Sequence, residues 1–250
     1  METWEDEVVV LSARACGEGH AVAAVFARGH GLRRGFVYGG SGRRSRAMWQ
    51  PGTILAARFL ARLPDQLGRL EGEPLFAASA ATFESALALA VLASALAMAE
   101  TAFPEAEPHP RVYEGLVGLL ARLAHGAGQD VLADYVRWEV GLLADLGYGL
   151  DLSACAASGV REGLAFVSPR TGRAVSAAAA GPWRERLLPL PPFLVGEAEA
   201  SVGDVVSGLR LTGHFLARDV FGVAHRPPPE ARARLVEAVV SLASARPEPA

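Results

Sequence analysis

Short apolar runs separated by glycine-rich turns characterise the first 76 residues of the chain. The runs cover residues 8–14, 21–27, 32–40, 53–63 and 67–76. Five short strands at this spacing favour a small closed β-barrel over a βαβ unit. Residues 55–63 also fit a helical pattern, so the assignment of this run stays open at the level of the sequence.

Helical periodicity replaces the strand pattern after Pro74. An alanine- and leucine-rich stretch over residues 81–100 begins the helical region, and its apolar part is too short for a membrane span and predicts a buried core helix. An amphipathic helix is predicted over 132–146, with Asp130 as its N-cap and Gly147 as its C′ glycine.

The last hundred residues alternate between irregular and helical patterns. Residues 150–192 are less regular, and they contain a hairpin candidate at 166–175 and a proline-rich exit. Two further helices are predicted over 202–221 and 230–245. The hydrophobic pattern therefore predicts an α+β protein with an N-terminal barrel and a mostly helical remainder.

Composition and charge restrict the function. The chain is 51% hydrophobic and 20% charged with a net charge of −3, which is typical of a globular protein and excludes a protein that coats nucleic acid with its whole surface. Cys16 and Cys155 are the only cysteines, and the acidic start of the sequence lacks the apolar region of a signal peptide. We therefore expect a cytoplasmic protein.

The cationic residues are distributed unevenly. Residues 19–64 contain eight arginines and no aspartate or glutamate, whereas the rest of the chain has 16 arginines and 27 acidic residues. The chain has no lysine, so every fixed cation is a planar guanidinium that can bind phosphate through two N–H groups. This segment is therefore predicted to contact phosphates.

Two other interpretations of these arginines are a solvated face and pairing with acids of the helical region. Against both, Phe36, Tyr38 and Trp49 are interleaved with the arginines, and aromatic rings can stack on bases. Tyr38 and Trp49 could equally be barrel core, and core packing is the favoured role for Phe36. Nucleic-acid binding is the preferred prediction.

No catalytic motif supports an enzyme. The six histidines have no metalloprotease spacing, no serine lies in a GxSxG motif, and no glycine-rich run continues into a P-loop. Cys155-Ala-Ala-Ser158 has the spacing of a zinc-binding CxxC pair but lacks its second cysteine, and no second pair follows. The sequence therefore predicts no catalytic residue, no metal and no cofactor.

With these residues in view, the chain resembles the bacterial recombination mediator family RecO. The resemblance rests on VVVLSAR (8–14), VFARGHG (25–31), GGSGRRSRAMWQPG (39–52), RWEVGLLADLGYGLDLSACAASG (137–159) and FVSPRTGRAVS (166–176). It implies an OB-fold over residues 1–78 and a helical domain over 79–250. It also implies a zinc-finger-like insertion at 151–192, in which some members hold zinc by four cysteines. Here only Cys155 is present, so the insertion is expected to be degenerate.

The resemblance further implies a function. Members bind single- and double-stranded DNA and anneal complementary strands, and with RecR, and in some settings RecF, they help load the recombinase RecA onto DNA covered by single-strand-binding protein (SSB). They can dock on the acidic-hydrophobic C-terminal tail of SSB, and a nucleoid-associated cytoplasmic location follows. The alternative is a protein–protein adaptor whose arginines dock an acidic partner, with incidental DNA binding.

The predicted DNA-binding residues come from the arginine-rich segment, two of them on the third strand and three on a glycine-loosened loop after it. They are Arg28, Arg33, Arg34, Tyr38, Arg43, Arg44, Arg46, Trp49 and Arg58. A partner-docking site needs a cation beside an apolar groove in the helical domain. Arg137, near Trp138 and Leu142, is the candidate for that site.

Overall fold

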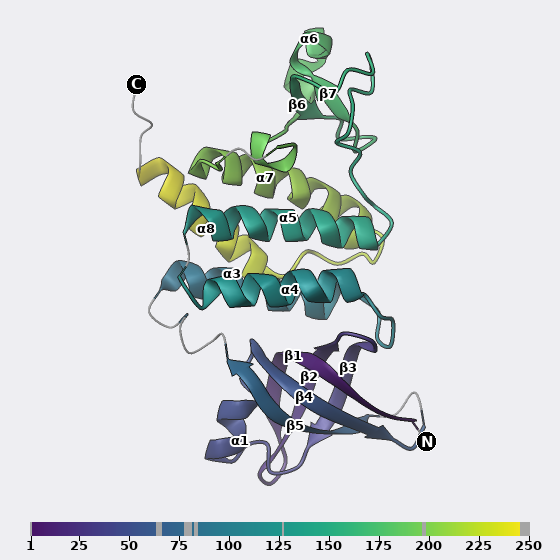
Figure 1. Cartoon of the computed structure of the whole chain (residues 1–250), viewed down its shortest axis with the longest axis vertical. Helices are drawn as coiled ribbons and strands as arrows, with labels where there is room; N and C mark the ends of the chain where they lie inside the picture. Colours follow the sequence, from purple (N-terminus) through teal and green to yellow (C-terminus); the bar gives the residue numbers. More distant parts are fainter. Residues whose placement is uncertain are drawn as a thin grey trace. The chain divides into compact units, whose positions relative to one another are not determined.

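The computed structural model describes residues 2–63, 67–77, 82, 85–126, 128–196 and 199–245 (Figure 1). The chain divides into two compact units, Met1–Gly126 and Ala127–Ala250. The domain boundary predicted between residues 78 and 79 lies outside the described residues. Among the described helices, none has the length and apolar character that a membrane span requires.

A closed barrel of five strands forms the N-terminal part of the first unit. The strands are β1 (Glu2–Cys16), β2 (His20–Ala27), β3 (Gly31–Val37), β4 (Thr53–Ala61) and β5 (Gly68–Ala77). Their order around the barrel is β1-β2-β3-β5-β4, with β1 pairing antiparallel to β4 and β3 pairing parallel to β5. This five-stranded barrel confirms the predicted OB-fold, and it assigns the ambiguous run at 55–63 to a strand.

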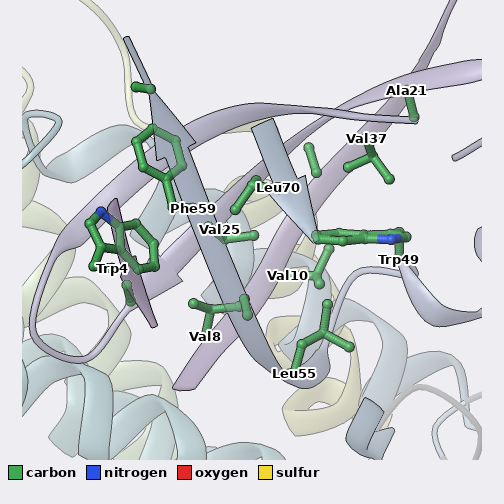
Figure 2. Close-up of a cluster of buried hydrophobic side chains, with 14 residues drawn as sticks. Trp4, Val8, Val10, Ala21, Val25, Val37, Trp49, Leu55, Phe59 and Leu70 are labelled. Atoms are coloured by element: carbon green, nitrogen blue, oxygen red, sulfur yellow. The ribbon is translucent and has the colours of Figure 1, made fainter. Parts of the chain in front are cut away.

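Alternating inward-facing side chains fill the barrel (Figure 2). At one end the rings of Trp4 and Phe59 stack with their centroids 5.0 Å apart. Val8, Val10 and Leu55 come from neighbouring strands and are fully buried between them. Apolar residues at every second position explain why the segments β1 to β5 fold as strands with one buried face rather than as helices.

A short helix, α1 (Arg43–Met48), follows the glycine-rich turn after β3. The sequence predicted a loop here, and that prediction was wrong. Trp49, which follows the helix, is 2% exposed and belongs to the barrel core, and Met48 packs against the same core. Helix α1 lies beside the barrel (Figure 1). Six residues alone form an unstable helix, and we attribute its stability to the burial of Met48 and Trp49 against the barrel core.

Two helices of the first unit, α3 (Ala86–Ala102) and α4 (Pro110–Leu123), cover part of the outer barrel surface. The ring of Phe26 on β2 stacks on Phe103 at 5.5 Å and lies 6.0 Å from the ring of Tyr113. The connection between the helices crosses the start of β3, where a Cβ on Gly31 would lie 1.9 Å from the Glu107 carbonyl oxygen. Only glycine fits there, because Gly31 also has φ +67°.

The described residues of the second unit form three long helices and a small sheet with short helices beside it. The helices are α5 (Gln129–Asp145), α7 (Val202–Phe215), which continues as the π-helical turn η3 (Leu216–Val220), and α8 (Glu230–Ala245). The sheet has the order β7-β6-β8 and consists of β6 (Leu164–Val167), β7 (Ala174–Ser176) and β8 (Leu188–Pro189). Helix α6 (Ala177–Ala180) and the 3-10 helices η1 (Gly181–Arg186) and η2 (Pro192–Leu194) accompany the sheet.

Several details of this unit test the sequence predictions. The antiparallel pairing of β6 with β7 confirms the hairpin predicted at 166–175. The helix predicted at 230–245 is confirmed by α8. The prediction of Asp130 as an N-cap was wrong, because Gly128 is the N-cap of α5 and Asp130 lies in its first turn. An acidic residue in that position still interacts favourably with the helix dipole.

Candidate nucleic-acid interface

Arg33 lies at one end of the barrel, and its charge is used within the fold. Its guanidinium is 2.7 Å from the Glu2 carboxylate and lies over the Phe59 ring, 5.6 Å from the centroid. The side chain is 12% exposed. A phosphate would have to displace Glu2 to reach it, so the structure does not place Arg33 on an open surface.

Arg28 and Arg34 are paired with acids from the region of α3 and α4. Arg28 donates to Glu114 at 2.7 Å, in an exposed pair. Arg34 donates to Glu105 and lies 3.7 Å from Glu100. This is the pairing that the sequence left open as an alternative, and it leaves little net positive charge around these two arginines.

Arg58 lies on an acidic part of the barrel surface. It projects from β4, 3.8 Å from Glu5 on β1, and is directly opposite Glu71 on β5. Asp6 and Glu73 line the same hollow. These carboxylates, of which Glu71 also pairs with Arg69, offset the charge of Arg58 and weaken its attraction for a polyanion.

The arginines of α1 are more accessible. Arg43 and Arg46 are exposed and form no ion pair within the part of the chain that the structure describes. The side chain of Arg44 lies outside the described residues. Trp49, predicted as a possible stacking platform, is barrel core instead, as the alternative interpretation held.

One outward-facing row of side chains crosses four strands, and no helix of the described residues is recorded against it. Arg14 on β1 is paired with Val22 on β2, Val22 with Phe36 on β3, and Phe36 with Arg69 on β5. Phe36 is half-buried on the outer surface, so its predicted place in the barrel core was wrong. The cause is strand alternation: Gly35 and Val37 are buried on the inner side, which places Phe36 outside.

The neighbouring row marks where the covering helices end. Ser12, Ala24 and Arg34 are aligned across β1, β2 and β3. Glu100 of α3 accepts a hydrogen bond from Ser12 at 3.0 Å and lies near Arg34. The row of Arg14, Val22 and Phe36 lies two residues away from this row on each strand, on the side away from β1 residue Ser12 and its contact with Glu100.

Tyr38 adds an exposed ring to this area. It is 60% exposed, and its centroid lies 4.8 Å from that of Phe36 and 5.4 Å from that of His20. The Arg69 guanidinium lies over the Tyr38 ring at 4.8 Å and also pairs with Glu71 at 2.5 Å. Arg14 forms no ion pair within the described residues.

We call this surface the open barrel face. Its members are Arg14, His20, Val22, Phe36, Tyr38 and Arg69. The residues predicted from the sequence include Tyr38 but not Arg14, His20 or Arg69. The alternation of inward and outward residues on β1 and β2 could have identified Arg14 and His20, but the pairing of β3 with β5 that adds Arg69 is not visible in the sequence.

The predicted partner-docking residues are part of the core of the second unit. Leu142 is fully buried and Trp138 is 6% exposed, so neither can line an open groove. Arg137 pairs with Asp134 at 2.9 Å and donates to the Phe193 carbonyl oxygen at 3.2 Å. The guanidinium therefore contributes to packing of α5 against the segment at η2.

The residues around Cys155 do not fit zinc. The Cys155 thiol accepts a hydrogen bond from the Ser176 backbone N–H at 3.3 Å. Hydrogen bonds with Ser158 and Ser176 lower the pKa of the Cys155 thiol to about 6. Tetrahedral zinc requires four nitrogen or sulfur ligands, and among the described residues no cluster of three or more metal-binding side chains exists. The Cys155 sulfur instead has hydrogen bonds with Ser158 and Ser176.

The chain is similar to known proteins over most of its length. A family model described as "Recombination protein O N terminal" matches residues 1–76, and one described as "Recombination protein O C terminal" matches residues 84–226. The chain is 51% identical to the DNA repair protein RecO of Granulibacter bethesdensis over 241 residues, which is 96% of each chain. It is also 51% identical to the DNA repair protein RecO of Gluconacetobacter diazotrophicus over 243 residues (96% of each chain), and 48% identical to that of Rhodospirillum centenum over 236 residues (94% of this chain and 93% of the relative).

Proposed function

The chain belongs to the RecO family of recombination and DNA repair proteins, and from this premise we propose that it is a DNA-binding recombination mediator that anneals complementary strands. The observation that carries the proposal is the open barrel face, where Phe36 and Tyr38 lie between Arg14 and Arg69. In OB-folds the surface around strands 2 and 3 and the adjoining loops carries the ligand.

The proposed contacts divide by chemistry. Tyr38 presents an exposed ring on which a base can stack, and base–aromatic stacking tolerates any sequence. Arg14 and the α1 residues Arg43 and Arg46 supply charges that form no ion pair with a carboxylate of the described residues. Arg69 is held over Tyr38, and its exposed pair with Glu71 is of the kind worth little free energy, so a phosphate can compete for it.

The revised surface changes the role of the other predicted arginines. Arg28, Arg33 and Arg34 are proposed to stabilise the first unit through their carboxylate partners. Arg58 is proposed to make no phosphate contact, because of the acids around it. Arg44 is kept with its neighbours on α1 as a proposed contact.

The proposed mechanism is electrostatic and geometric, with no catalytic step. Arginines neutralise the phosphates of the bound strand, which lowers its repulsion for a complementary strand. Stacking on Tyr38 holds bases splayed from the backbone, where they are available for pairing. As a RecO family member, the protein is further proposed to cooperate with RecR, and with RecF where present, in loading RecA onto SSB-covered DNA, after contact with the SSB tail.

Binding of a fluorescein-labelled oligothymidylate, followed by anisotropy, tests the proposal. If four arginines each neutralise one phosphate of a single strand, log K falls with log salt at a slope of about −3. Tyr38→Ala should weaken binding by about 5- to 160-fold, which corresponds to ~1–3 kcal/mol for one stacked base. Tyr148→Ala is the matched control, because Tyr148 is also an exposed tyrosine but lies in the second unit.

The annealing of two labelled complementary oligonucleotides, with and without SSB, completes the test. The wild-type protein should accelerate annealing, and Tyr38→Ala should reduce that acceleration. A wild-type protein that neither binds the oligothymidylate nor accelerates annealing would overturn the proposal. Retention of a protein partner after complete loss of DNA binding would favour the adaptor alternative.

A further inference from the structure

A second group of aromatic and arginine side chains lies beside the small sheet of the second unit. Trp183, in η1, is 59% exposed, whereas the other three tryptophans of the chain are at most 8% exposed. A tryptophan ring left in water forgoes the burial free energy of a large apolar surface. Because tryptophan is enriched at binding interfaces, an exposed tryptophan indicates a binding role more strongly than an exposed smaller apolar residue does.

Two guanidinium groups lie over aromatic rings at this position. The Cζ atom of Arg186 lies 5.5 Å from the Trp183 ring centroid, and that of Arg184 lies 5.4 Å from the centroid of Phe166 on β6. Within the described residues, neither arginine forms an ion pair with a carboxylate. Stacking fixes a planar guanidinium while leaving N–H groups at its edge for an anion.

These arginines differ from Arg28 and Arg34 of the first unit. Arg28 and Arg34 have carboxylate partners, so their charges are largely compensated inside the first unit. Arg184 and Arg186 have aromatic partners, which orient the charge without cancelling it. Glu185 stands between them in the sequence, and η1 keeps a net positive charge with two arginines and one glutamate.

We propose that Phe166, Trp183, Arg184 and Arg186 form a second nucleic-acid surface that binds a single strand. A base stacks on Trp183, and the two guanidinium groups contact the neighbouring phosphates. This inference rests on the proposed function, because annealing brings two strands to one protein. The open barrel face belongs to the first unit and the second surface to the other, so each unit carries one strand-binding surface.

An acidic protein segment is the other class of ligand that two arginines could attract. Nucleic acid is favoured because the site has an exposed indole ring in addition to its charges, and bases offer a flat π-surface that acidic side chains lack. The same pairing of an exposed ring with an overlying guanidinium occurs at Tyr38 and Arg69 on the open barrel face. The two surfaces therefore share one recognition chemistry.

Tryptophan fluorescence of the full chain tests the proposal directly. Iodide-accessible emission should come from Trp183, because the other tryptophans are buried. A short oligothymidylate should quench this emission, and the quenching should disappear in Trp183→Phe. Arg184→Ala combined with Arg186→Ala should raise the oligonucleotide concentration for half-quenching at least 5-fold. Arg210→Ala combined with Arg234→Ala removes the same charge from exposed positions on α7 and α8 and should leave it unchanged.

The two proposals fail in distinguishable ways. Tyr38→Ala should leave Trp183 quenching intact, while Trp183→Ala should leave oligonucleotide binding at the barrel intact and slow annealing at least 5-fold. Oligonucleotide that binds and anneals with no change in Trp183 emission would overturn the second surface and leave the proposed function standing. Quenching by an acidic peptide but not by oligothymidylate would overturn it in favour of a protein ligand.

Discussion

Removing the guanidinium of Arg232 should strongly destabilise the second unit, because it would leave a buried carboxylate without its counter-charge. Glu139 on α5 is completely buried, and the Arg232 side chain on α8 is 8% exposed. The two side chains form two hydrogen bonds, Nε to Oε1 at 2.6 Å and a terminal nitrogen to Oε2 at 2.9 Å. Tyr135 and Thr212 donate to the same carboxylate, so the network joins α5, α7 and α8.

The expected loss follows from the burial of this pair. Breaking a buried ion pair by removing one partner costs about 3–5 kcal/mol, whereas replacing both partners by apolar residues is often neutral or stabilising. Arg232→Met should therefore lower the free energy of unfolding by ~3–5 kcal/mol. For a unit of this size such a loss lowers Tm by roughly 10–20 °C. Combining Arg232→Met with Glu139→Leu should recover most of it.

The charge state of the arginine does not complicate the measurement. Burial alone would lower the pKa of Arg232, but the adjacent Glu139 carboxylate more than offsets this and the pKa is raised. Because the pKa of Arg232 is higher in the folded than in the unfolded state, its stabilisation is fully present below the unfolded-state pKa, which already lies far above neutral pH, and is lost only when the pH rises through the folded-state pKa. The contribution is therefore constant across the neutral range.

Urea unfolding, followed by the fluorescence of Trp138 on α5, measures the loss, since Trp138 lies beside Tyr135 at a ring distance of 5.8 Å. A Trp183→Phe background removes the exposed tryptophan from the signal without altering the buried network. If the double variant is as unstable as Arg232→Met alone, the loss does not come from an unpaired buried carboxylate and the reasoning is refuted.

Three further outcomes are expected. Gly31→Ala should destabilise the first unit by at least about 2 kcal/mol in urea unfolding, because its Cβ would clash with the Glu107 carbonyl at a positive φ; unchanged stability would contradict the close approach. Glu100→Gln should tighten oligothymidylate binding about 1.5- to 5-fold at low salt, because a negative charge beside Arg34 is removed; an equal gain at high salt would show that charge is not the cause. Dialysis against a chelator should leave Tm within about 1 °C, because no described residue joins Cys155 in a metal-binding cluster, and a larger fall would show a bound metal.

The barrel was predictable because its signals are local. Apolar alternation and glycine turns marked all five strands, and the hairpin at 166–175 followed from the same reasoning. Helix α1 was not predictable from periodicity, because six residues contain less than two helical turns. What fixes it is the burial of Met48 and Trp49, which depends on a barrel that the local sequence does not describe.

The candidate binding surface was harder to predict because ion pairing is not local. Glu114 lies 86 residues from Arg28, and Glu105 lies 71 residues from Arg34, so an acid-free segment of sequence does not become an acid-free surface. Partner assignment of this kind needs the tertiary structure. Arg137 likewise donates to the Phe193 carbonyl oxygen, 56 residues away, and with Trp138 and Leu142 it is packed in the second unit rather than in an open docking groove.

Whether a side chain points into or out of the barrel is a better guide to its candidate phosphate contacts than the density of arginines in the sequence. Arg33 and Arg34 are adjacent, yet one is held at the barrel end by Glu2 and the other is outside, beside Glu105. Arg14 lies outside the acid-free segment and was not selected, although it is aligned with Val22 and Phe36 on the uncovered row. We expect an arginine of this barrel to bind phosphate where its side chain points outward and has no carboxylate partner. Within the described residues Arg14 meets both conditions, so its substitution should reduce DNA binding more than substitution of Arg33 or Arg34 in the same salt-dependence measurement.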